Sequence, residues 1–541
     1  MQEPQIQPQD LSTATSLNAS NVDTPPPRFF KPVFFGVIAV ALIYIATQLF
    51  ADLSQIPQMT LFSFALLAFA LMIALGFEFV NGFHDTANAV ATVIYTNAMP
   101  APVAVMWAGL FNFLGVLFAS GAVAYGILAL LPVELILNVS SGAGFAMVFA
   151  LLIAAITWNL GTWYFGIPAS SSHTMVGSII GVGLMNQLLN SAHGTSGVDI
   201  EQVIKVGKAL LFSPMIGFVF AALVFLLLKF FFKKRLELFQ PPVGNQPPPL
   251  GIRAMLIFTC TGVSFAHGSN DGQKGMGLIM LILIGVAPLA YSLNKTLDTA
   301  QVQSFVAVSE QAAQVLATET QTPAMTQVDA RATLTRYIQD RQINADVVPA
   351  VAVLSQHVGE EVATYQNMDK VPANMVATLR NDMYLSSAAL KRLDKDKAMP
   401  ELKATDSQVI DRYRKGLDQV TQYIPTWVKV AVALALGLGT MVGWKRIVVT
   451  VGERIGKSHM TYGQGMAAEL VAMTTIGIAD RLGMPVSTTH VLNSAVAGTM
   501  TANKSGLQWS TIRTILSAWV LTLPATVALS GGLYWLFLKF V

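Results

Sequence analysis

The sequence predicts an all-α polytopic membrane protein that contains an inverted internal repeat. Hydrophobic residues make up 53% of the 541 residues and charged residues only 12%, whereas charged residues approach a quarter of an ordinary soluble domain. Several apolar stretches are long enough to cross a hydrocarbon layer of about 30 Å. Two polar motifs each occur twice, once in each half of the chain. Such motifs are tolerated at membrane depth only where protein or a water-filled cavity surrounds them.

About eleven crossings are expected, with a range of ten to twelve because an interrupted segment can be a broken span or a re-entrant hairpin. A polar, Pro-rich tail (residues 1–32) is expected to be disordered, and an extra transmembrane helix (33–50) follows it without a signal-peptide cleavage site. Each half then contributes five crossings, and an odd number inverts the second copy. These segments are 60–97, 102–131, 143–165, 166–190 and 208–232, then 252–291, 427–444, 464–482, 483–503 and 511–538.

The spacing of the two motifs locates an insertion. Asp271 follows Asp85 by 186 residues, whereas His490 follows His173 by 317, so 131 extra residues lie in the second half. Only the stretch 293–426 changes in composition, mixing charge with helical apolar spacing. We therefore predict a soluble helical insertion there. The predicted domains are a first repeat (60–232), a cytoplasmic linker (233–251), a second repeat (252–292 and 427–541) and the insertion (293–426).

Basic clusters orient the chain in the membrane. Lys and Arg concentrate at 229–235 and again at 445–457, which marks these segments as cytoplasmic and puts the insertion outside.

The net charge of +3 is too small to suggest a nucleic-acid partner. The single cysteine, Cys260, lies in an apolar run, so no disulfide framework is expected.

The first motif pair aligns Gly82 with Gly268 and Asp85 with Asp271. Glycine lets a helix break, so we expect an interruption at each copy, with free N–H and C=O groups at the half-helix ends. With the carboxylates, these groups suit a small hard cation, or a proton, beside an anion. A structural pair of carboxylates salt-bridged to Lys274 is the alternative, but it does not explain the duplication. Neutral oxygens and amides come from Asn81, Asn88 and Asn270.

The second motif pair begins at Pro168 and Pro485, each followed by three hydroxyl side chains. Proline ends or kinks a helix, because it lacks an N–H and clashes with the preceding turn. Hydroxyls at a helix start provide donors beside free backbone N–H groups, which suits a tetrahedral oxyanion. N-capping is the alternative for one copy, but two copies favour a ligand. The predicted substrate-binding residues are Ser170, Ser171, Ser172, Ser487, Thr488, Thr489 and Asn88.

Histidines lie at all four motif copies, and imidazole can relay protons near neutral pH. A structural hydrogen-bonding role is equally open for each, including His267, and their spacing does not predict zinc, so no fixed metal site is expected. Glu469 is a lone carboxylate in the apolar run 464–479, which makes it a functional candidate. The residues assigned to cation or proton coupling are Asp85, Asp271, Asn81, Asn270, Glu469, His84, His173 and His490.

These motifs resemble the signatures of the inorganic phosphate transporter (PiT) family, in particular its bacterial low-affinity phosphate permeases. The resemblance rests on Gly82-Phe83-His84-Asp85-Thr86-Ala87-Asn88-Ala89, Gly268-Ser269-Asn270-Asp271-Gly272 and Pro485-Val486-Ser487-Thr488-Thr489-His490. It covers nearly all of 60–292 and 427–541. It implies cation-coupled transport of orthophosphate, with the aspartates and the Ser/Thr segments handling cation and phosphate. Many sodium-coupled relatives carry a glutamate where this chain has Asn112, while Glu469 matches theirs, which disfavours sodium coupling.

We therefore expect an inverted-repeat secondary transporter in the bacterial cytoplasmic (inner) membrane. It would import inorganic phosphate by proton symport, alone or as a neutral complex with a divalent metal ion. The expected partners are phosphate, protons, divalent metal ions and the lipid bilayer, without a cofactor, and a homo-oligomer is left open. Sulfate or another oxyanion, sodium-coupled symport, and a channel or phosphate sensor remain alternatives. An enzyme is disfavoured, because no Gly-x-Ser-x-Gly elbow precedes a helix.

Overall fold

The computed structural model describes residues 25–54, 60–85, 87–131, 141–189, 198–242, 246–318, 325–340 and 342–540, with single positions 22, 136 and 244. The side chains at 62, 63, 87 and 88 lie outside this description, as does most of the tail predicted at 1–32. Within the described part the regular secondary structure is helical, with one isolated β-bridge between Gly456 and Leu507. The predicted all-α fold is confirmed.

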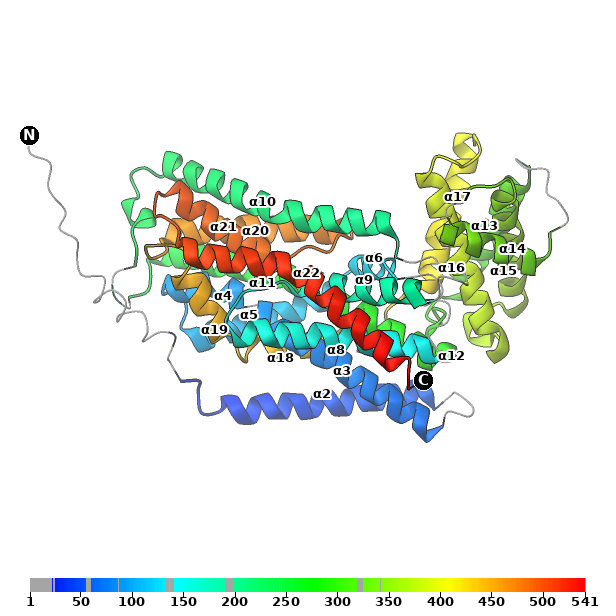
Figure 1. Ribbon diagram of the computed structural model, residues 1–541, viewed down its shortest axis with the longest axis horizontal. Helices are drawn as coiled ribbons and strands as arrows, with labels where there is room; N and C mark the ends of the chain where they lie inside the picture. Colours follow the sequence, from blue (N-terminus) through cyan, green and yellow to red (C-terminus); the bar gives the residue numbers. More distant parts are fainter. Residues whose placement is uncertain are drawn as a thin grey trace, which may run out of the picture.

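Helices follow one another with short connections in both halves (Figure 1). The first half contains α2 (Phe30–Leu53), α3 (Leu61–Asp85), α4 (Ala87–Tyr95), α5 (Ala101–Phe118), α6 (Ala122–Leu128), α8 (Gly142–Tyr164), α9 (Ser171–Leu189), α10 (Ile200–Phe231) and the 3-10 turn η2 (Leu236–Phe239). The second half contains α11 (Leu250–Val286), α12 (Pro288–Tyr291), α18 (Thr426–Thr440), α19 (Lys445–Glu453), α20 (Tyr462–Arg481), α21 (Thr488–Ala502) and α22 (Trp509–Phe537). Between α12 and α18 lie α13 (Thr299–Thr318), α14 (Gln327–Asp340), α15 (Val347–Tyr365), η3 (Met368–Lys370), α16 (Ala373–Lys395) and α17 (Ala404–Thr421).

Seven described helices are long and apolar enough to cross a membrane, or eight if the pair α17 and α18, bent by 68°, counts as one span. The segments expected at 166–190, 464–482 and 483–503 correspond to α9, α20 and α21, which are not among the seven. These three helices carry or adjoin the polar motifs, and most of their residues are buried within the protein. The count of about eleven therefore remains a prediction.

The two halves pack against each other in a reciprocal pattern. Helix α3 packs on α18 and α11 packs on α5, while α9 packs on α22 and α21 packs on α10. Glycines permit the close approaches: a Cβ on Gly82 would lie 2.3 Å from the carbonyl oxygen of Leu436, and one on Gly268 would lie 2.2 Å from that of Asn112. In lipid, helix association depends on such close packing.

The helix interruption expected at Gly268 is wrong. Helix α11 runs without a break from Leu250 to Val286 through the whole second copy of the motif. Gly268 instead allows α11 to pack closely on α5, because any side chain at this position would collide with the Asn112 backbone. In the first copy, α3 ends at Asp85 and α4 begins at Ala87, with residue 86 between them outside the described residues.

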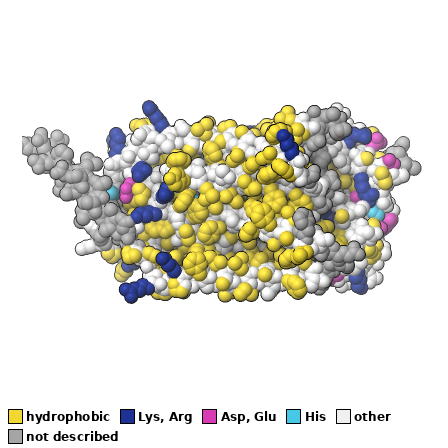
Figure 2. All heavy atoms as spheres, turned by 60° about the horizontal axis from the view of Figure 1, so that its bottom comes forward, with side chains coloured by type: hydrophobic (Ala, Val, Ile, Leu, Met, Phe, Trp, Pro, Cys, Tyr) yellow, Lys and Arg dark blue, Asp and Glu magenta, His cyan; other side chains and the backbone are white. Residues whose placement is uncertain are grey.

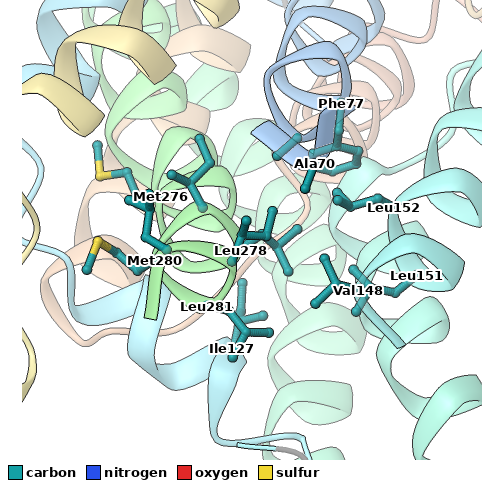
Figure 3. Packing of buried hydrophobic residues seen from close by; sticks show 14 of the residues in the cluster. Ala70, Phe77, Ile127, Val148, Leu151, Leu152, Met276, Leu278, Met280 and Leu281 are labelled. Atoms are coloured by element: carbon teal, nitrogen blue, oxygen red, sulfur yellow. The ribbon is translucent and has the colours of Figure 1, made fainter. Parts of the chain in front are cut away.

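Apolar side chains fill the interior and also cover the outside of the helical body. In Figure 3, Leu278 of α11 lies among Phe77 of α3 and Val148 of α8, and all three are buried. Figure 2 shows hydrophobic side chains over the middle of the visible face, with Lys and Arg gathered towards its ends. A broad apolar surface between two charged ends is what a bilayer requires of a spanning protein.

Helices α13 to α17 gather at one end of the molecule (Figure 1) around a hydrophobic cluster of their own. Tyr337 and Tyr413 are buried in this cluster. Arg331 donates to both carboxylate oxygens of the buried Asp382 at 2.6 and 2.8 Å. Lys395 of α16 pairs with Glu201 at the start of α10. The basic cluster 229–235 lies at the other end of that helix, which is 32 residues or about 48 Å long.

Candidate functional site

Two matching connections carry the proline motifs. Gly166 (φ +66°) lies two residues after the end of α8 and Gly483 (φ +63°) two residues after the end of α20, both in the left-handed region that favours glycine. Each end forms paired capping hydrogen bonds, with Ile167 N donating to Thr162 O and Met484 N donating to Ala479 O. Four non-helical residues follow in each case, 167–170 and 484–487. The proline sits directly after the cap, where a helix cannot continue.

The next helices, α9 and α21, begin with their hydroxyl-bearing residues. The Ser170 hydroxyl oxygen accepts from His173 N at 3.2 Å, and Ser487 accepts from His490 N at 3.1 Å. Ser170 and Ser487 are therefore N-caps, the role considered as the alternative above. The other hydroxyls of the two runs are left to interact across the interior. All six predicted hydroxyl residues are buried.

Asp85 is the meeting point of both hydroxyl-bearing helices. Ser171 of α9 donates to its Oδ2 at 2.5 Å, and Thr489 of α21 donates to its Oδ1 at 2.8 Å. The neighbouring His84 Nδ1 lies 2.9 Å from Oδ1, while His84 Nε2 lies 3.1 Å from Thr162 Oγ1. The structure thus brings residues predicted for cation coupling together with residues predicted for substrate binding.

Asp271 has a different set of neighbours. Lys274 Nζ lies 2.6 Å from its Oδ1, and His267 Nε2 lies 3.5 Å from its Oδ2. Lys274 also donates to Ser172 Oγ at 2.5 Å, and Ser172 in turn donates to the Val486 carbonyl oxygen at 2.7 Å. Lys274 and Asp271 are both fully buried. The salt bridge that the alternative interpretation proposed is present, but it lies inside the site and not apart from it.

The two carboxylates share one hydroxyl. Ser171 Oγ lies 2.5 Å from Asp85 Oδ2 and 3.3 Å from Asp271 Oδ2, and a hydroxyl has a single proton to donate. Ligand atoms of Asp85, His267 and Asp271 all lie within 4.8 Å of one another. Two buried carboxylates this close are unfavourable unless a positive charge neutralises them. These three residues therefore form a candidate site for a proton or a metal ion.

The histidines of the second motif pair face each other. The ring centroids of His173 and His490 are 4.4 Å apart, and His490 stacks on Trp519 at 3.8 Å. Because each histidine lies in the first turn of its helix, this contact brings the starts of α9 and α21 side by side. The positive ends of two helix dipoles converge there, which favours an anion.

Several buried polar atoms at the site have no hydrogen-bond partner among the described residues. They include Thr488 Oγ1, Asn270 Oδ1 and Asn81 Oδ1. The amide of Asn270 donates to the Met484 carbonyl oxygen at 3.2 Å, and that of Asn81 to Glu78 Oε2 at 3.4 Å. Unpaired buried polar atoms are costly in a folded protein, so their presence points to a ligand. The side chain of Asn88 lies outside the described residues.

Glu469 is not part of this cluster. It accepts hydrogen bonds from Thr92 and, at 2.5 Å, from Thr259. Thr259 lies twelve residues before Asp271 on α11, or about 18 Å along the helix. The carboxylate is fully buried, but the structure does not bring it to the aspartates.

Sequence reasoning missed Glu78. It is fully buried in α3, and a Cβ on Gly275 would lie 2.3 Å from its Cγ. Gly275 directly follows Lys274 on α11, so this carboxyl group lies beside the site. The rule that selected Glu469, a lone carboxylate in an apolar run, applies equally to Glu78 in 60–80 and would have found it.

Comparison with known proteins identifies the family of this chain. The model of the phosphate transporter family matches residues 81–530. The chain belongs to this family. It is 44% identical over 495 residues to the low-affinity inorganic phosphate transporter PitA of Escherichia coli (strain K12), covering 88% of this chain and 97% of that protein.

Other members of the phosphate transporter family give similar coverage. PitB of Escherichia coli (strain K12) is 43% identical over 498 residues, covering 88% of this chain and 97% of that one. The low-affinity inorganic phosphate transporter of Buchnera aphidicola subsp. Acyrthosiphon pisum (strain APS) is 39% identical over 497 residues, with 86% and 95% covered.

A solved structure, "The sodium-dependent phosphate transporter", is 19% identical, with a TM-score of 0.49 and coverage of 88% of this chain and all of that one.

Proposed function

We propose that the protein is a secondary transporter that imports inorganic phosphate across the bacterial cytoplasmic membrane by proton symport. Membership of the phosphate transporter family and 44% identity to a phosphate transporter over most of the chain support the substrate. The observation that carries the mechanism is the convergence of α9 and α21 on Asp85. It places donors for an anion directly beside carboxylates for a cation.

The anion half of the site consists of two helix starts and their hydroxyls. Phosphate would accept hydrogen bonds from Thr488, whose hydroxyl has no partner among the described residues, and from free backbone N–H groups in the first turns. Ser170 and Ser487 hold those turns in place as caps. A capped helix start keeps its donors oriented in the absence of ligand, which reduces the ordering cost of binding.

The cation half consists of Asp85, His267 and Asp271. Import of an anion against an inside-negative potential costs about 2.3 kcal/mol per charge for each 100 mV. A proton on the carboxylates, or a divalent metal bound between them and the phosphate, removes that cost. Carboxylate oxygens and imidazole nitrogen suit both, so a neutral metal–phosphate complex is a cargo that these residues fit.

The reciprocal helix packing supports an inverted repeat as the framework for alternating access. The motif helices α3 and α11 each pack on a helix of the other half, α18 and α5. Rocking of one half against the other would expose the same central site to either side. Lys395 of the insertion contacts the start of α10, and the basic cluster 229–235 lies at the other end of that helix, which supports an external insertion.

Uptake of radiolabelled phosphate into proteoliposomes tests this function. We expect accumulation above the external concentration when an inwardly directed proton gradient is imposed in sodium-free buffer, and its loss with a protonophore. Sulfate in tenfold excess should compete weakly. Equilibration without accumulation would indicate a channel, and a strict sodium requirement without a protonophore effect would refute proton coupling while leaving phosphate as the substrate.

A further inference from the structure

The internal repeat differs at one charged position inside the site. The 186-residue offset that aligns Asp85 with Asp271 also aligns Asn88 with Lys274. An aspartate followed three residues later by an asparagine supplies oxygen ligands of the kind that hard cations prefer. In the second copy the asparagine is replaced by a residue that is itself a cation.

Lys274 lies where a bound cation would contact the second aspartate. Its ammonium nitrogen is 2.6 Å from Asp271 Oδ1 and 2.5 Å from Ser172 Oγ. The carboxyl group of Glu78 on α3 also lies close by, since its Cγ would be 2.3 Å from a Cβ on Gly275, the residue after Lys274. The lysine side chain is fully buried, and buried charges persist only when paired in this way. A mobile cation and the ammonium cannot both occupy the same side of the Asp271 carboxylate.

The same ammonium is connected to both hydroxyl-bearing helices. Ser172 at the start of α9 accepts from Lys274 and donates to the carbonyl oxygen of Val486, in the connection just before α21. The positive charge is thus fixed to the element that would receive the anion. A salt bridge with a purely structural role would not need this link to both helix starts.

We propose that Lys274 is a built-in cation, which replaces a mobile metal cation beside Asp271 and makes phosphate binding at this half of the site independent of sodium. The proposal rests on the proposed function and deepens it. It assigns Lys274 as the residue that determines cation specificity. Only the Asp85 side of the site, which His267 of α11 also faces, then remains to take a proton or a metal ion during each cycle.

The test compares three substitutions of Lys274. Lys274→Asn introduces the residue that the first repeat carries, Lys274→Arg keeps the charge, and Lys274→Met removes it without supplying an oxygen ligand. Lys429→Asn is the matched control. Lys429 lies on α18 and donates to the Ala119 carbonyl oxygen at 3.0 Å, not to a residue of the site. Each variant is reconstituted, and phosphate uptake is measured under a proton gradient in choline and in sodium medium.

We expect wild type, Lys274→Arg and Lys429→Asn to accumulate phosphate equally in both media. Lys274→Asn should lose at least tenfold of its uptake rate in choline and recover a large part of it in sodium. Lys274→Met should be low in both media. Normal uptake by Lys274→Asn in choline, or low uptake that sodium does not restore in a correctly folded variant, would overturn the proposal.

A second measurement does not depend on transport. Purified Lys274→Asn should show a saturable rise in melting temperature with sodium chloride that choline chloride does not reproduce, whereas wild type and Lys274→Arg should show none. An equal sodium shift in wild type and Lys274→Asn would overturn the proposal. Failure of wild type to accumulate phosphate would instead refute the proposed function, and the melting data would still decide on Lys274.

Discussion

The two aspartates of the repeated motif occupy equivalent sequence positions but different environments. Asp85 accepts hydrogen bonds from neutral hydroxyls of two helices, Ser171 on α9 and Thr489 on α21. Asp271 is paired with the ammonium of Lys274 one helical turn further along α11. The first carboxylate thus lies against neutral hydroxyls and the His84 imidazole, while the second is paired with a lysine ammonium.

This difference indicates that the two repeats keep a carboxylate at the same position but use it for different functions. A carboxylate held by hydroxyls can bind and release a proton or metal ion, because the hydroxyls can reorient. A carboxylate paired with a buried lysine gains little from a further cation. The predictions below separate these two tasks, beginning with the largest effect.

Removing either carboxylate should abolish coupled uptake. We expect Asp85→Asn and Asp271→Asn to lower phosphate accumulation by a factor on the order of a hundred, because each removes a charge-assisted interaction of about 1.5–3 kcal/mol or more at a buried site. Proteoliposome uptake under a proton gradient measures this. Normal accumulation by both variants would remove the aspartates from the mechanism.

Stability should distinguish the two variants. Asp271→Asn leaves the buried Lys274 ammonium without this carboxylate, which costs about 3–5 kcal/mol, whereas Asp85→Asn changes hydrogen bonds to the neutral hydroxyls of Ser171 and Thr489. Thermal unfolding in detergent should therefore show a clear loss for Asp271→Asn alone. The double variant Asp271→Asn with Lys274→Met should regain most of that loss, and equal melting of all three variants would contradict the pairing.

The hydroxyls should divide into ligand-binding and capping groups. We expect Thr488→Val and Ser171→Ala to weaken phosphate binding about tenfold or more, because a hydrogen bond to a charged group contributes about 1.5–3 kcal/mol. The capping variants Ser170→Ala and Ser487→Ala should each lose about 1 kcal/mol of stability and weaken binding less, because the caps act on the ligand only through the orientation of the first turn. Titration of the purified protein with phosphate measures the affinity of each variant. Wild-type affinity in all four variants would contradict this division.

The smallest effect concerns topology and should leave transport unchanged. In a Cys260→Ala background, cysteines replace Lys395 of the insertion and Lys233 of the basic cluster. An impermeant maleimide applied to intact spheroplasts should label the first position and not the second, since charge places 229–235 in the cytoplasm. The reverse pattern would invert the assignment of the whole second half.

Much of this site could be predicted because its signals are local and repeated. The doubled aspartates and the doubled Pro-hydroxyl segments identified residues that the structure does place together around Asp85. The break expected at Gly268 is absent, because a glycine that allows a helix to break and one that allows close packing on Asn112 look the same in a sequence. Chemistry alone grouped Glu469 with the aspartates, because the sequence does not show that Glu469 pairs with Thr259, about 18 Å along α11 from Asp271.

The pairing of Lys274 with Ser172 could not have been derived from sequence either. Ser172 lies 102 residues from Lys274 in the chain, and only the packed bundle brings α9 against α11. The reciprocal packing of α3 with α18 and of α5 with α11 is likewise a tertiary property. The sequence supplied the charges, and the fold determined which of them are partners.

The most direct test of the central claim is a cryo-EM structure of the full-length protein determined with and without phosphate in sodium-free buffer. The account predicts tetrahedral density at the starts of α9 and α21, within hydrogen-bond distance of Thr488 Oγ1 and close to the Lys274–Ser172 pair. Density for phosphate only at a place remote from Asp85 and Asp271, or helix starts that remain unchanged at saturating phosphate, would contradict it.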